Sequence, residues 1–400
     1  MKQPDLLPPR WPGHDMMNAR EHEAQHLLKV YGQLPIEPTH AKGVYLTYES
    51  RQILDLYGGH AVAALGYGHP DMLKTLNEQA QTLFFQSNAV AMEVRAEAAD
   101  ALADFAPAGL NHVFFANSGA EVNENALRLA CKLTGRSRVA AIKHGFHGRT
   151  AAAGAVSWGA RDKWYGFPNT PFEVDFIDRN VLADVTDKVS YETAAVILEL
   201  VQGLAGGFDL NSAFIHAIAD ACADKGALLI VDEVQTGMGR CGQAFATDLY
   251  NIKPDILTVA KSIAGGFPCA ALIVTDAIAS EIGPGDLGST FGGGPLACAL
   301  VKTVIDVIER DQLMRNVRVL SGYIEENCPV GPVDRLQGKG FLLGLKCRRP
   351  AIEVRNELLD RNILVGTSTD PHVIRLLPPL ITEEKHFTRL IESLAELPEI

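Results

Sequence analysis

The sequence predicts an α/β protein built on a doubly wound, mostly parallel sheet. Between about residues 111 and 275, short apolar runs rich in β-prone residues alternate with helical stretches. The runs lack a polar face, which is typical of strands covered on both sides. Such sheets bind ligands outside the carboxyl ends of their strands, so functional residues are expected directly after the runs. The runs are 112–116, 139–142, 194–198, 227–231, 256–259 and 270–274, with helices expected at 120–133 and 213–225.

The length of 400 residues suits two domains. A short helix is expected at 20–30, and a long helical stretch follows Pro295. The pattern then changes to a strand near 341–345, a helix near 352–361 and a closing helix from Glu383. We therefore expect a large domain over 51–295 and a smaller α+β domain over 296–400. The N-terminal segment, 1–50, is expected to join the smaller domain.

The charge balance excludes several classes of partner. Lys plus Arg number 36 and Asp plus Glu 48, which argues against nucleic acid and anionic membranes. No apolar run approaches the length of a membrane span, and residues 1–20 lack the pattern of a signal peptide. The seven cysteines are scattered without a CxxC pair, which favours reduced thiols over disulfides or a zinc cluster. A cytoplasmic location is expected.

The first candidate site segment follows the run at 112–116. Ser118, Gly119 and Ala120 form a small-residue turn before a helix. Backbone N–H groups at a helix start bind phosphate, and Gly119 would let the anion approach closely. Ser118 could instead serve only as an N-cap.

Two further strand ends carry charged residues. Asp232 follows the run at 227–231, where a carboxylate can keep a pyridinium nitrogen protonated and its ring an electron sink. Gln235, three residues on, could hydrogen-bond the phenolic oxygen of such a ring. Lys261 follows the run at 256–259, and lysine is the nucleophile that forms a Schiff base with an aldehyde cofactor and moves the α-proton.

A fourth segment, at 144–150, contributes an aromatic ring and a cation. Phe146 offers a face on which a cofactor ring could stack. Arg149 offers a guanidinium, which binds a carboxylate through two parallel hydrogen bonds. The four segments together predict one site for pyridoxal 5′-phosphate and a carboxylate-bearing substrate.

In these motifs the sequence resembles the class III aminotransferases, most closely their acetylornithine and ornithine branch. The resemblance runs from Tyr31-Gly32-Gln33-Leu34-Pro35 almost to the C-terminus. It is carried by Ser-Gly-Ala-Glu at 118–121, Phe-His-Gly-Arg-Thr at 146–150, Asp-Glu-Val-Gln-Thr-Gly at 232–237, Ala-Lys-Ser at 260–262, Gly-Ser-Thr-Phe-Gly-Gly at 288–293 and Arg-Leu-Leu-Pro-Pro-Leu at 375–380.

The resemblance implies the pyridoxal-phosphate-dependent transferase fold type I and a role for each matched residue. Gly119 and Ala120 would bind the cofactor phosphate, and Phe146 would stack on its ring. Asp232 would pair with the ring nitrogen, Gln235 would contact the phenolic oxygen, and Lys261 would carry the cofactor. The remaining implied roles are the phosphate contact of Thr290 from the neighbouring subunit of a homodimer, carboxylate binding by Arg149 and Arg375, and a substrate pocket lined by Tyr31 and His60.

The sequence departs from the family pattern at three positions near the substrate. Leu204 replaces a glutamate that pairs in the family with the arginine at position 375. Gly294 replaces an asparagine, and His60 replaces isoleucine or tyrosine. These changes leave the cofactor residues intact and leave the substrate open.

The expected activity is ping-pong transfer of an amino group from an amine or amino acid to 2-oxoglutarate, with an acetylornithine- or ornithine-like donor. The open alternatives on the same scaffold are an amine:pyruvate-type transaminase, an aminomutase and a decarboxylase. A catalytically silent binding protein is disfavoured because Lys261 and Asp232 are both present.

Other motif matches point to different functions. His22-Glu23-Ala24-Gln25-His26 matches the HExxH pattern of zinc peptidases, which is the alternative from another class, but a third ligand is not evident. The GxGxxG match at 283–288 contains Pro284 and does not link a strand to a helix. The apolar run ending in Asp232 resembles a Walker B strand, yet the sequence has no GxxxxGK[ST] loop.

Overall fold

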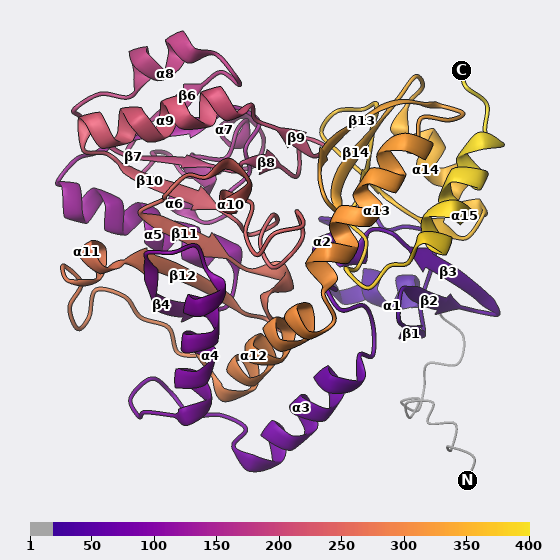
Figure 1. The fold of residues 1–400 in the computed structure, drawn as a ribbon, viewed down its shortest axis with the longest axis horizontal. Coiled ribbons are helices and arrows are strands. Elements are labelled where there is room, and N and C mark those ends of the chain that lie inside the picture. The colour runs from indigo at the N-terminus through magenta and orange to yellow at the C-terminus, as the bar shows by residue number, and fades with distance from the viewer. Residues whose placement is uncertain (1–18) are drawn as a thin grey trace.

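The computed structural model describes residues 19–400, and its largest sheet has seven strands (Figure 1). β12 runs antiparallel to both of its neighbours, and the other neighbouring pairs are parallel. The predicted doubly wound, mostly parallel sheet is confirmed. In spatial order the strands are β4 (Leu110–Ala116), β12 (Ala270–Thr275), β11 (Ile256–Val259), β10 (Leu228–Asp232), β7 (Thr193–Leu198), β5 (Arg138–Ile142) and β6 (Glu173–Ile177).

Both faces of this sheet are covered because successive side chains of each strand point to opposite faces. In β7, Ile197 packs in a buried cluster with residues of α5 (Gly119–Thr134), whereas Leu198 packs in a second cluster with residues of α9 (Ser212–Lys225). The β4 side of the second face is covered by α4 (Glu93–Phe105) and α12 (Pro295–Arg310). This double burial explains the uninterrupted apolar runs.

The start of α5 is fixed by its own sequence. The Ser118 hydroxyl accepts a hydrogen bond from the Glu121 N–H, which is the N-cap geometry. The helix ends at Gly135, whose φ of 67° lies in the left-handed region that glycine adopts without a Cβ clash. The helix is thereby held with its N-terminus at the carboxyl end of β4.

A second, smaller body of structure follows α12 (Figure 1). Its sheet is antiparallel throughout, in the spatial order β13 (Val333–Lys339), β14 (Leu342–Cys347), β17 (Val373–Leu376) and β16 (Gly366–Thr367). The helices here are α13 (Leu313–Asn327), α14 (Ala351–Asp360) and α15 (Glu384–Ala395).

Strands from the beginning and the end of the chain share another sheet. β1 (His40–Lys42), β2 (Tyr45–Tyr48) and β3 (Arg51–Asp55) form an antiparallel ribbon. β3 then pairs in parallel with β15 (Ile363–Leu364), about three hundred residues further on. The N-terminal strands thus lie against the C-terminal part, as the domain division at residues 50 and 295 would require; the boundaries themselves stay a prediction.

One expected helix differs in the structure, and one strand of the large sheet was not expected. The helix expected at 20–30 is shorter, α1 (Ala19–His26), and has no buried residue. β6 was not predicted, because its sequence alternates charged and apolar residues as an edge strand does. The remaining elements are α2 (Gly58–Ala61), α3 (Pro70–Thr82), α6 (Ala151–Ala155), α7 (Ala160–Lys163), α8 (Leu182–Lys188), β8 (Val201–Gln202), β9 (Phe208–Asp209), α10 (Thr247–Tyr250) and α11 (Asp276–Ala279).

Candidate functional site

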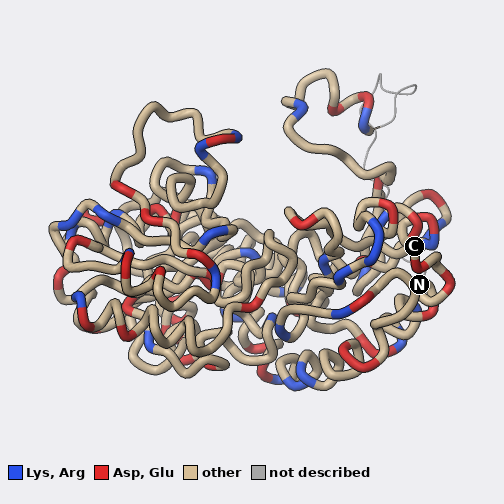
Figure 2. The backbone as a smooth tube through the Cα atoms, turned by 90° about the horizontal axis from the view of Figure 1, so that it is seen from above, with Lys and Arg blue, Asp and Glu red and all other residues tan. Residues whose placement is uncertain are grey.

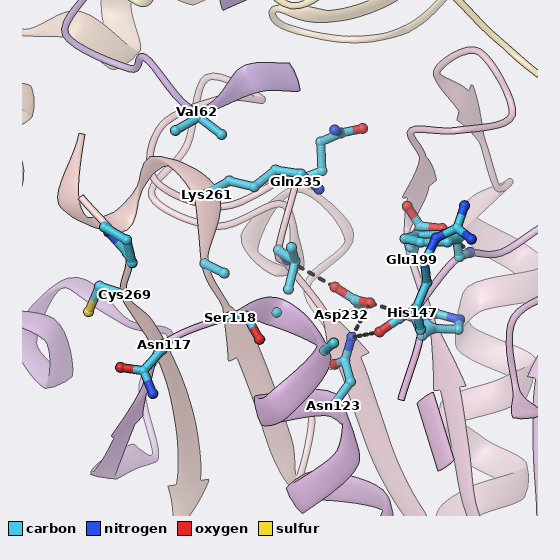
Figure 3. A pocket seen from close by; sticks show the side chains of 18 of the residues that line it. Val62, Asn117, Ser118, Asn123, His147, Glu199, Asp232, Gln235, Lys261 and Cys269 are labelled. Atoms are coloured by element: carbon cyan, nitrogen blue, oxygen red, sulfur yellow. Dashed lines mark hydrogen bonds and ion pairs between the residues drawn. The ribbon is translucent and has the colours of Figure 1, made fainter. Parts of the chain in front are cut away.

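A cavity of about 420 Å³ lies at the carboxyl ends of β4, β10 and β11 (Figure 3). Its wall brings together segments that are far apart in the sequence, as the strand-end rule predicts. Eight of the predicted site residues line it: Ser118, Gly119, Ala120, Phe146, Arg149, Asp232, Gln235 and Lys261.

Lys261 lies in this cavity, two residues after the end of β11, at the start of a 3-10 helix, Lys261–Ala264. Its φ of 47° falls in the left-handed region, which strains a residue with a Cβ and is common at functional sites. Burial lowers the pKa of the Lys261 ammonium, while Asp232 and Glu199 act in the opposite direction. Within residues 19–400 its Nζ has no hydrogen bond or ion pair. The amine is therefore uncommitted and loses its proton more readily than an exposed lysine.

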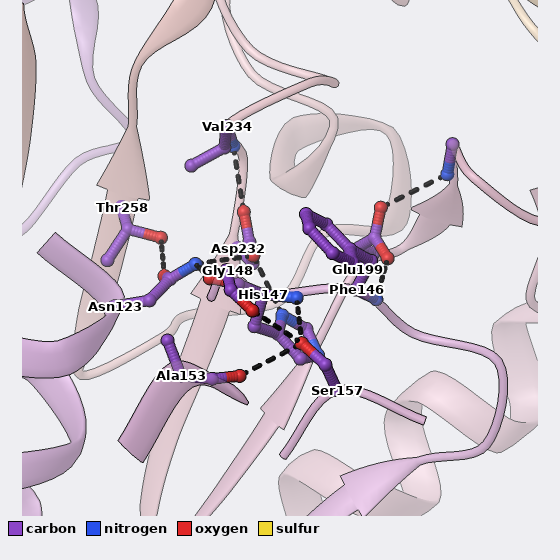
Figure 4. A network of polar contacts seen from close by, with 11 residues as sticks. Asn123, Phe146, His147, Gly148, Ala153, Ser157, Glu199, Asp232, Val234 and Thr258 are labelled. Carbon is purple, nitrogen blue, oxygen red and sulfur yellow. Dashed lines mark hydrogen bonds and ion pairs between the residues drawn. The ribbon is translucent and has the colours of Figure 1, made fainter. Parts of the chain in front are cut away.

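Asp232 ends β10 and is only 3% exposed. Its Oδ2 accepts hydrogen bonds from Asn123 Nδ2 at 2.8 Å and from His147 Nδ1 at 2.7 Å (Figure 4). Its Oδ1 accepts from the Val234 N–H at 3.0 Å. Asn123 is oriented in turn by the Thr258 hydroxyl, which donates to Asn123 Oδ1 at 2.7 Å. Three donors thus hold the buried carboxylate in a fixed orientation.

Glu199 follows β7 and is also buried. Its two oxygens accept hydrogen bonds from the backbone N–H groups of Phe146, at 2.9 Å, and Gly203, at 3.0 Å. Burial and the nearby Asp232 raise the pKa of the Glu199 carboxyl. Glu199 therefore fixes the position of Phe146 and of the turn at Gly203.

Sequence reasoning gave no role to Asn123, His147 or Glu199. Glu199 could have been found by the same strand-end rule that selected Asp232, because it follows the apolar run at 194–198. Asn123 is a polar residue among the buried apolar positions of α5, which signals a buried hydrogen-bond network. His147 carried no such signal apart from its place in the motif at 146–150.

The N-terminus of α5 offers free donors to the cavity. The Glu121 carboxylate accepts from the Asn117 N–H and from the Ser118 hydroxyl, both at 3.0 Å. Within the described residues the N–H groups of Gly119 and Ala120 have no acceptor. Free N–H groups at a helix start favour an anion such as phosphate.

Gln235 reaches the cavity from the turn after β10. Its side chain lies against Gly203 so closely that a Cβ at position 203 would overlap the amide. Its Nε2 also donates to the His60 carbonyl at 3.4 Å, which joins the cofactor side of the site to the segment around His60.

Arg375, on β17, lies at the edge of this arrangement and is only 5% exposed. Its guanidinium donates to the carbonyls of Thr367, at 2.7 Å, and Gly203, at 3.2 Å, and to the Tyr57 hydroxyl at 2.6 Å. No Asp or Glu in residues 19–400 forms an ion pair with it. Burial lowers the pKa of the Arg375 guanidinium, but arginine remains charged near neutral pH.

Leu204 replaces the glutamate expected from the family pattern. It directly follows Gly203, whose carbonyl accepts a hydrogen bond from Arg375. Its carbonyl accepts hydrogen bonds from the Thr369 N–H, at 3.0 Å, and hydroxyl, at 3.2 Å. Its apolar side chain gives Arg375 no charged partner. Gly294, the second departure, precedes α12 and caps it without a side-chain hydrogen bond.

The other predicted substrate residues are spread more widely. His60 is exposed, and its Nδ1 lies 2.8 Å from the Tyr57 hydroxyl. The Arg149 guanidinium stacks over the Trp164 ring at 4.5 Å. Tyr31 is 86% exposed and Thr290 is exposed, and neither lines the cavity of this chain. In Figure 2 the first part of the described chain forms a loop that extends away from the main body of the molecule.

The donor set of the cavity fits pyridoxal phosphate. Free N–H groups on α5 suit a phosphate, the buried carboxylate of Asp232 suits a protonated ring nitrogen, and the uncommitted Lys261 amine suits an aldehyde. All three groups line the same cavity, whose volume is about 420 Å³. The residues present therefore match each functional group of that cofactor.

Features of the other function classes are not found in the part of the chain that the structure describes. Residues 19–400 contain no group of three His, Cys, Asp or Glu side chains arranged to hold a metal ion, and His22 and His26 lie on α1. None of the described helices is both long and apolar enough to cross a membrane. The seven cysteines are all free thiols.

Comparison with known proteins identifies the family. A model of the aminotransferase class-III family matches residues 28–397. Acetylornithine aminotransferase from Methanosarcina acetivorans is 33% identical over 94% of this chain and 95% of its own length. The corresponding enzyme from Archaeoglobus fulgidus is 36% identical, with coverages of 93% and 98%.

A solved structure supports the same assignment. The ornithine aminotransferase from Toxoplasma gondii, with pyridoxal phosphate at partial occupancy, has a TM-score of 0.87 and 26% identity, covering 94% of this chain and 93% of its own. The predicted resemblance, the fold type and the cofactor are confirmed. The chain belongs to the class III aminotransferases, enzymes that depend on pyridoxal phosphate and act on amines and oxo acids.

Proposed function

We propose that this enzyme transfers an amino group from a carboxylate-bearing amine, of the acetylornithine or ornithine type, to 2-oxoglutarate by a ping-pong mechanism. The observation that carries the proposal is the presence of two groups together, the uncommitted Lys261 amine in the cavity and the buried Arg375 guanidinium, which has no carboxylate of the described residues bonded to it. One suits the cofactor aldehyde, and the other suits a substrate carboxylate.

In this proposal the cofactor is held by the large sheet. The N–H groups of Gly119 and Ala120 bind its phosphate, with Ser118 capping the helix that presents them. Phe146 stacks on its ring, and Gln235 contacts its phenolic oxygen. When bound, pyridoxal phosphate supplies an aldehyde and an electron-withdrawing ring that stabilises negative charge on the carbon that loses a proton.

The catalytic groups are Lys261 and Asp232. Lys261 Nζ would move a proton from the amine-bearing carbon of the donor to the cofactor in the first half of the cycle, and from the cofactor to the acceptor carbon in the second half. The lowered pKa of Lys261 favours the neutral amine that this step needs. Asp232, which accepts hydrogen bonds from Asn123, His147 and Val234, would pair with the ring nitrogen and keep it protonated.

Substrate carboxylates would bind to Arg375 and Arg149, with His60 and Tyr31 lining the outer part of the pocket. Arg375 is already oriented by three hydrogen bonds, so that binding costs little ordering. Tyr31 would need its segment to fold toward the site, since it is 86% exposed in this chain.

A homodimer with active sites at the subunit interface completes the proposal. Phe84, Phe85, Val90 and Phe291 are exposed, and the rings of Phe85 and Phe291 lie 5.5 Å apart. Exposed apolar groups gathered in this way are typical of an interface. Thr290 adjoins Phe291, so a partner's surface placed here would bring Thr290 near the phosphate site of the other subunit. Sedimentation analysis of the holoenzyme checks the assembly.

We also propose a cytoplasmic location, which the seven free thiols support.

The test of the function is a half-reaction screen. The yellow holoenzyme is mixed with single amines and amino acids, and the loss of its visible absorption band is followed. We expect ornithine-like donors to bleach the band and 2-oxoglutarate to restore it. Pyruvate is tested as acceptor in parallel, and release of carbon dioxide or of a rearranged amine is assayed. A donor that bleaches the band with carbon dioxide release, or an enzyme restored only by pyruvate, would contradict the proposal.

A further inference from the structure

Tyr57 lies between Arg375 and His60 in the structure. Its hydroxyl oxygen accepts a hydrogen bond from Arg375 Nη2 at 2.6 Å and lies 2.8 Å from His60 Nδ1. An arginine has only donors, so the Tyr57 oxygen accepts there and its proton is free for His60 Nδ1. The Arg375 guanidinium also lies over the Tyr57 ring, 5.4 Å from its centre.

Several contacts hold Tyr57 in this position. The buried Asp55 carboxylate accepts from the N–H groups of Tyr57, at 2.7 Å, and Gly58, at 2.9 Å, and from the Tyr67 hydroxyl at 2.5 Å. The Tyr57 ring packs against Gly366 of β16, where a Cβ would overlap it. The phenol is thus fixed from the backbone and from the ring, and Arg375 meets a rigid partner.

The donor count of Arg375 leaves room for a ligand. A guanidinium has five N–H donors, and three are used, by Thr367, Gly203 and Tyr57. One N–H therefore remains on each terminal nitrogen, and two such donors are what a carboxylate takes in a bidentate pair. All three present partners are neutral oxygens, and the one carboxylate within residues 19–400 that acts on the guanidinium charge, Glu199, makes no hydrogen bond or ion pair with it. A buried guanidinium without a directly bonded acidic partner favours an anionic ligand.

We propose that Tyr57 is a positioning residue that determines specificity: it holds Arg375 in place without neutralising it, so that every substrate of the cycle presents a carboxylate to this arginine. Where an acidic residue pairs with the arginine, a substrate carboxylate must first displace it. A phenol leaves the charge available to donor and acceptor alike. The inference rests on the proposed function, and it selects amino donors with a carboxylate within reach of Arg375 over simple amines.

The test uses a ligand that binds without reacting. Glutarate, a five-carbon dicarboxylate without amine or oxo group, is titrated into wild-type holoenzyme and into Tyr57→Phe by calorimetry. We expect the Kd for glutarate to rise about ten-fold in the variant, the effect of losing one hydrogen bond to a charged group. Tyr323→Phe is the matched control, because it removes a partly buried hydroxyl that bonds Thr388 far from the cavity. Its Kd should equal that of the wild type.

A kinetic ratio separates positioning from general damage. The kcat/KM of a carboxylate-bearing donor divided by that of a carboxylate-free amine should fall about ten-fold in Tyr57→Phe. A merely structural role would lower both values together and leave the ratio unchanged. An unchanged ratio and an unchanged glutarate Kd in a wild type that transaminates overturn this inference alone. A wild type whose absorption band no amine bleaches overturns the proposed function instead.

Discussion

At the carboxyl end of β10, the Asp232 carboxylate accepts three hydrogen bonds, one of them from a histidine, whereas the buried Arg375 guanidinium on β17 donates to neutral oxygens only. The two groups are almost equally buried, at 3% and 5% exposed. In the proposed function, residues of the chain itself hold the carboxylate at the cofactor end, whereas the guanidinium at the substrate end is left for a substrate carboxylate to bind. We therefore expect the first end to keep its partners through the cycle and the second to exchange them.

The largest expected effect is at the cofactor end. Lys261→Ala should reduce transamination below detection while the cofactor still binds without a covalent bond, because no other lysine of residues 19–400 lines the cavity. Borohydride reduction followed by mass spectrometry should place the pyridoxyl group on Lys261 in the wild type. The exposed Lys302→Ala is the control and should keep full activity. A pyridoxyl group on another lysine would show the assignment to be wrong.

The next effect concerns the charge at Asp232. Asp232→Asn keeps the side-chain size and removes the negative charge that favours a protonated ring nitrogen, so we expect a loss of about 100-fold or more in kcat with cofactor still bound. The absorption spectrum reports cofactor binding, and steady-state kinetics report the loss. Near-normal turnover would contradict the view that the cofactor end depends on this compensated charge.

A smaller effect is expected at the substrate end. Leu204→Glu would give Arg375 the acidic partner that it lacks, so that the α-carboxylate of a donor competes less well for it. We expect the kcat/KM ratio to shift toward a terminal-amino donor, relative to an α-amino donor, by about ten-fold or more. Leu204→Gln, which has similar size and no charge, is the control. A ratio that stays constant, or moves toward α-amino donors, would remove Leu204 from the account of specificity.

The smallest effect is on stability. Burial, Arg375 and Lys261 lower the pKa of His60 below its ordinary value of 6.5. The folded protein therefore binds a proton at His60 less readily than the unfolded chain, and stability is lost as the pH falls through the unfolded value. The decrease in Tm between pH 7.5 and 5.5 should be slightly larger in the wild type than in His60→Asn. An equal or smaller decrease in the wild type would mean that the charge of Arg375 is already compensated.

The same contrast explains what could be predicted from the sequence. Asp232 and Lys261 each follow a buried strand of a parallel sheet, and the rule for strand ends locates both without knowledge of side-chain contacts. The pairing of Arg375 with Tyr57 and Gly203 joins three segments from different parts of the chain. No local pattern specifies that contact, because it depends on how the smaller sheet packs against the larger one.

Tyr31 shows a second reason. Its predicted role came from the family resemblance alone, and the structure leaves its side chain 86% exposed. Thr290 likewise depends on a second subunit for its predicted role. Residues whose role requires another molecule, or a change of conformation, cannot be located from the fold of one chain.

The parallel pairing of β3 with β15 has a consequence for how the protein is made. Ile363 lies beside Leu54 in this sheet, and Leu364 lies beside Asp55. β3 therefore gains its second neighbouring strand only when the ribosome has added about three hundred further residues. Until then the ribbon of β1, β2 and β3 has an open edge, and closing so long a loop slows folding. The loop that carries Tyr57 is anchored by Asp55. The substrate end should therefore be the last part of the molecule to form during synthesis, after the sheet that binds the cofactor.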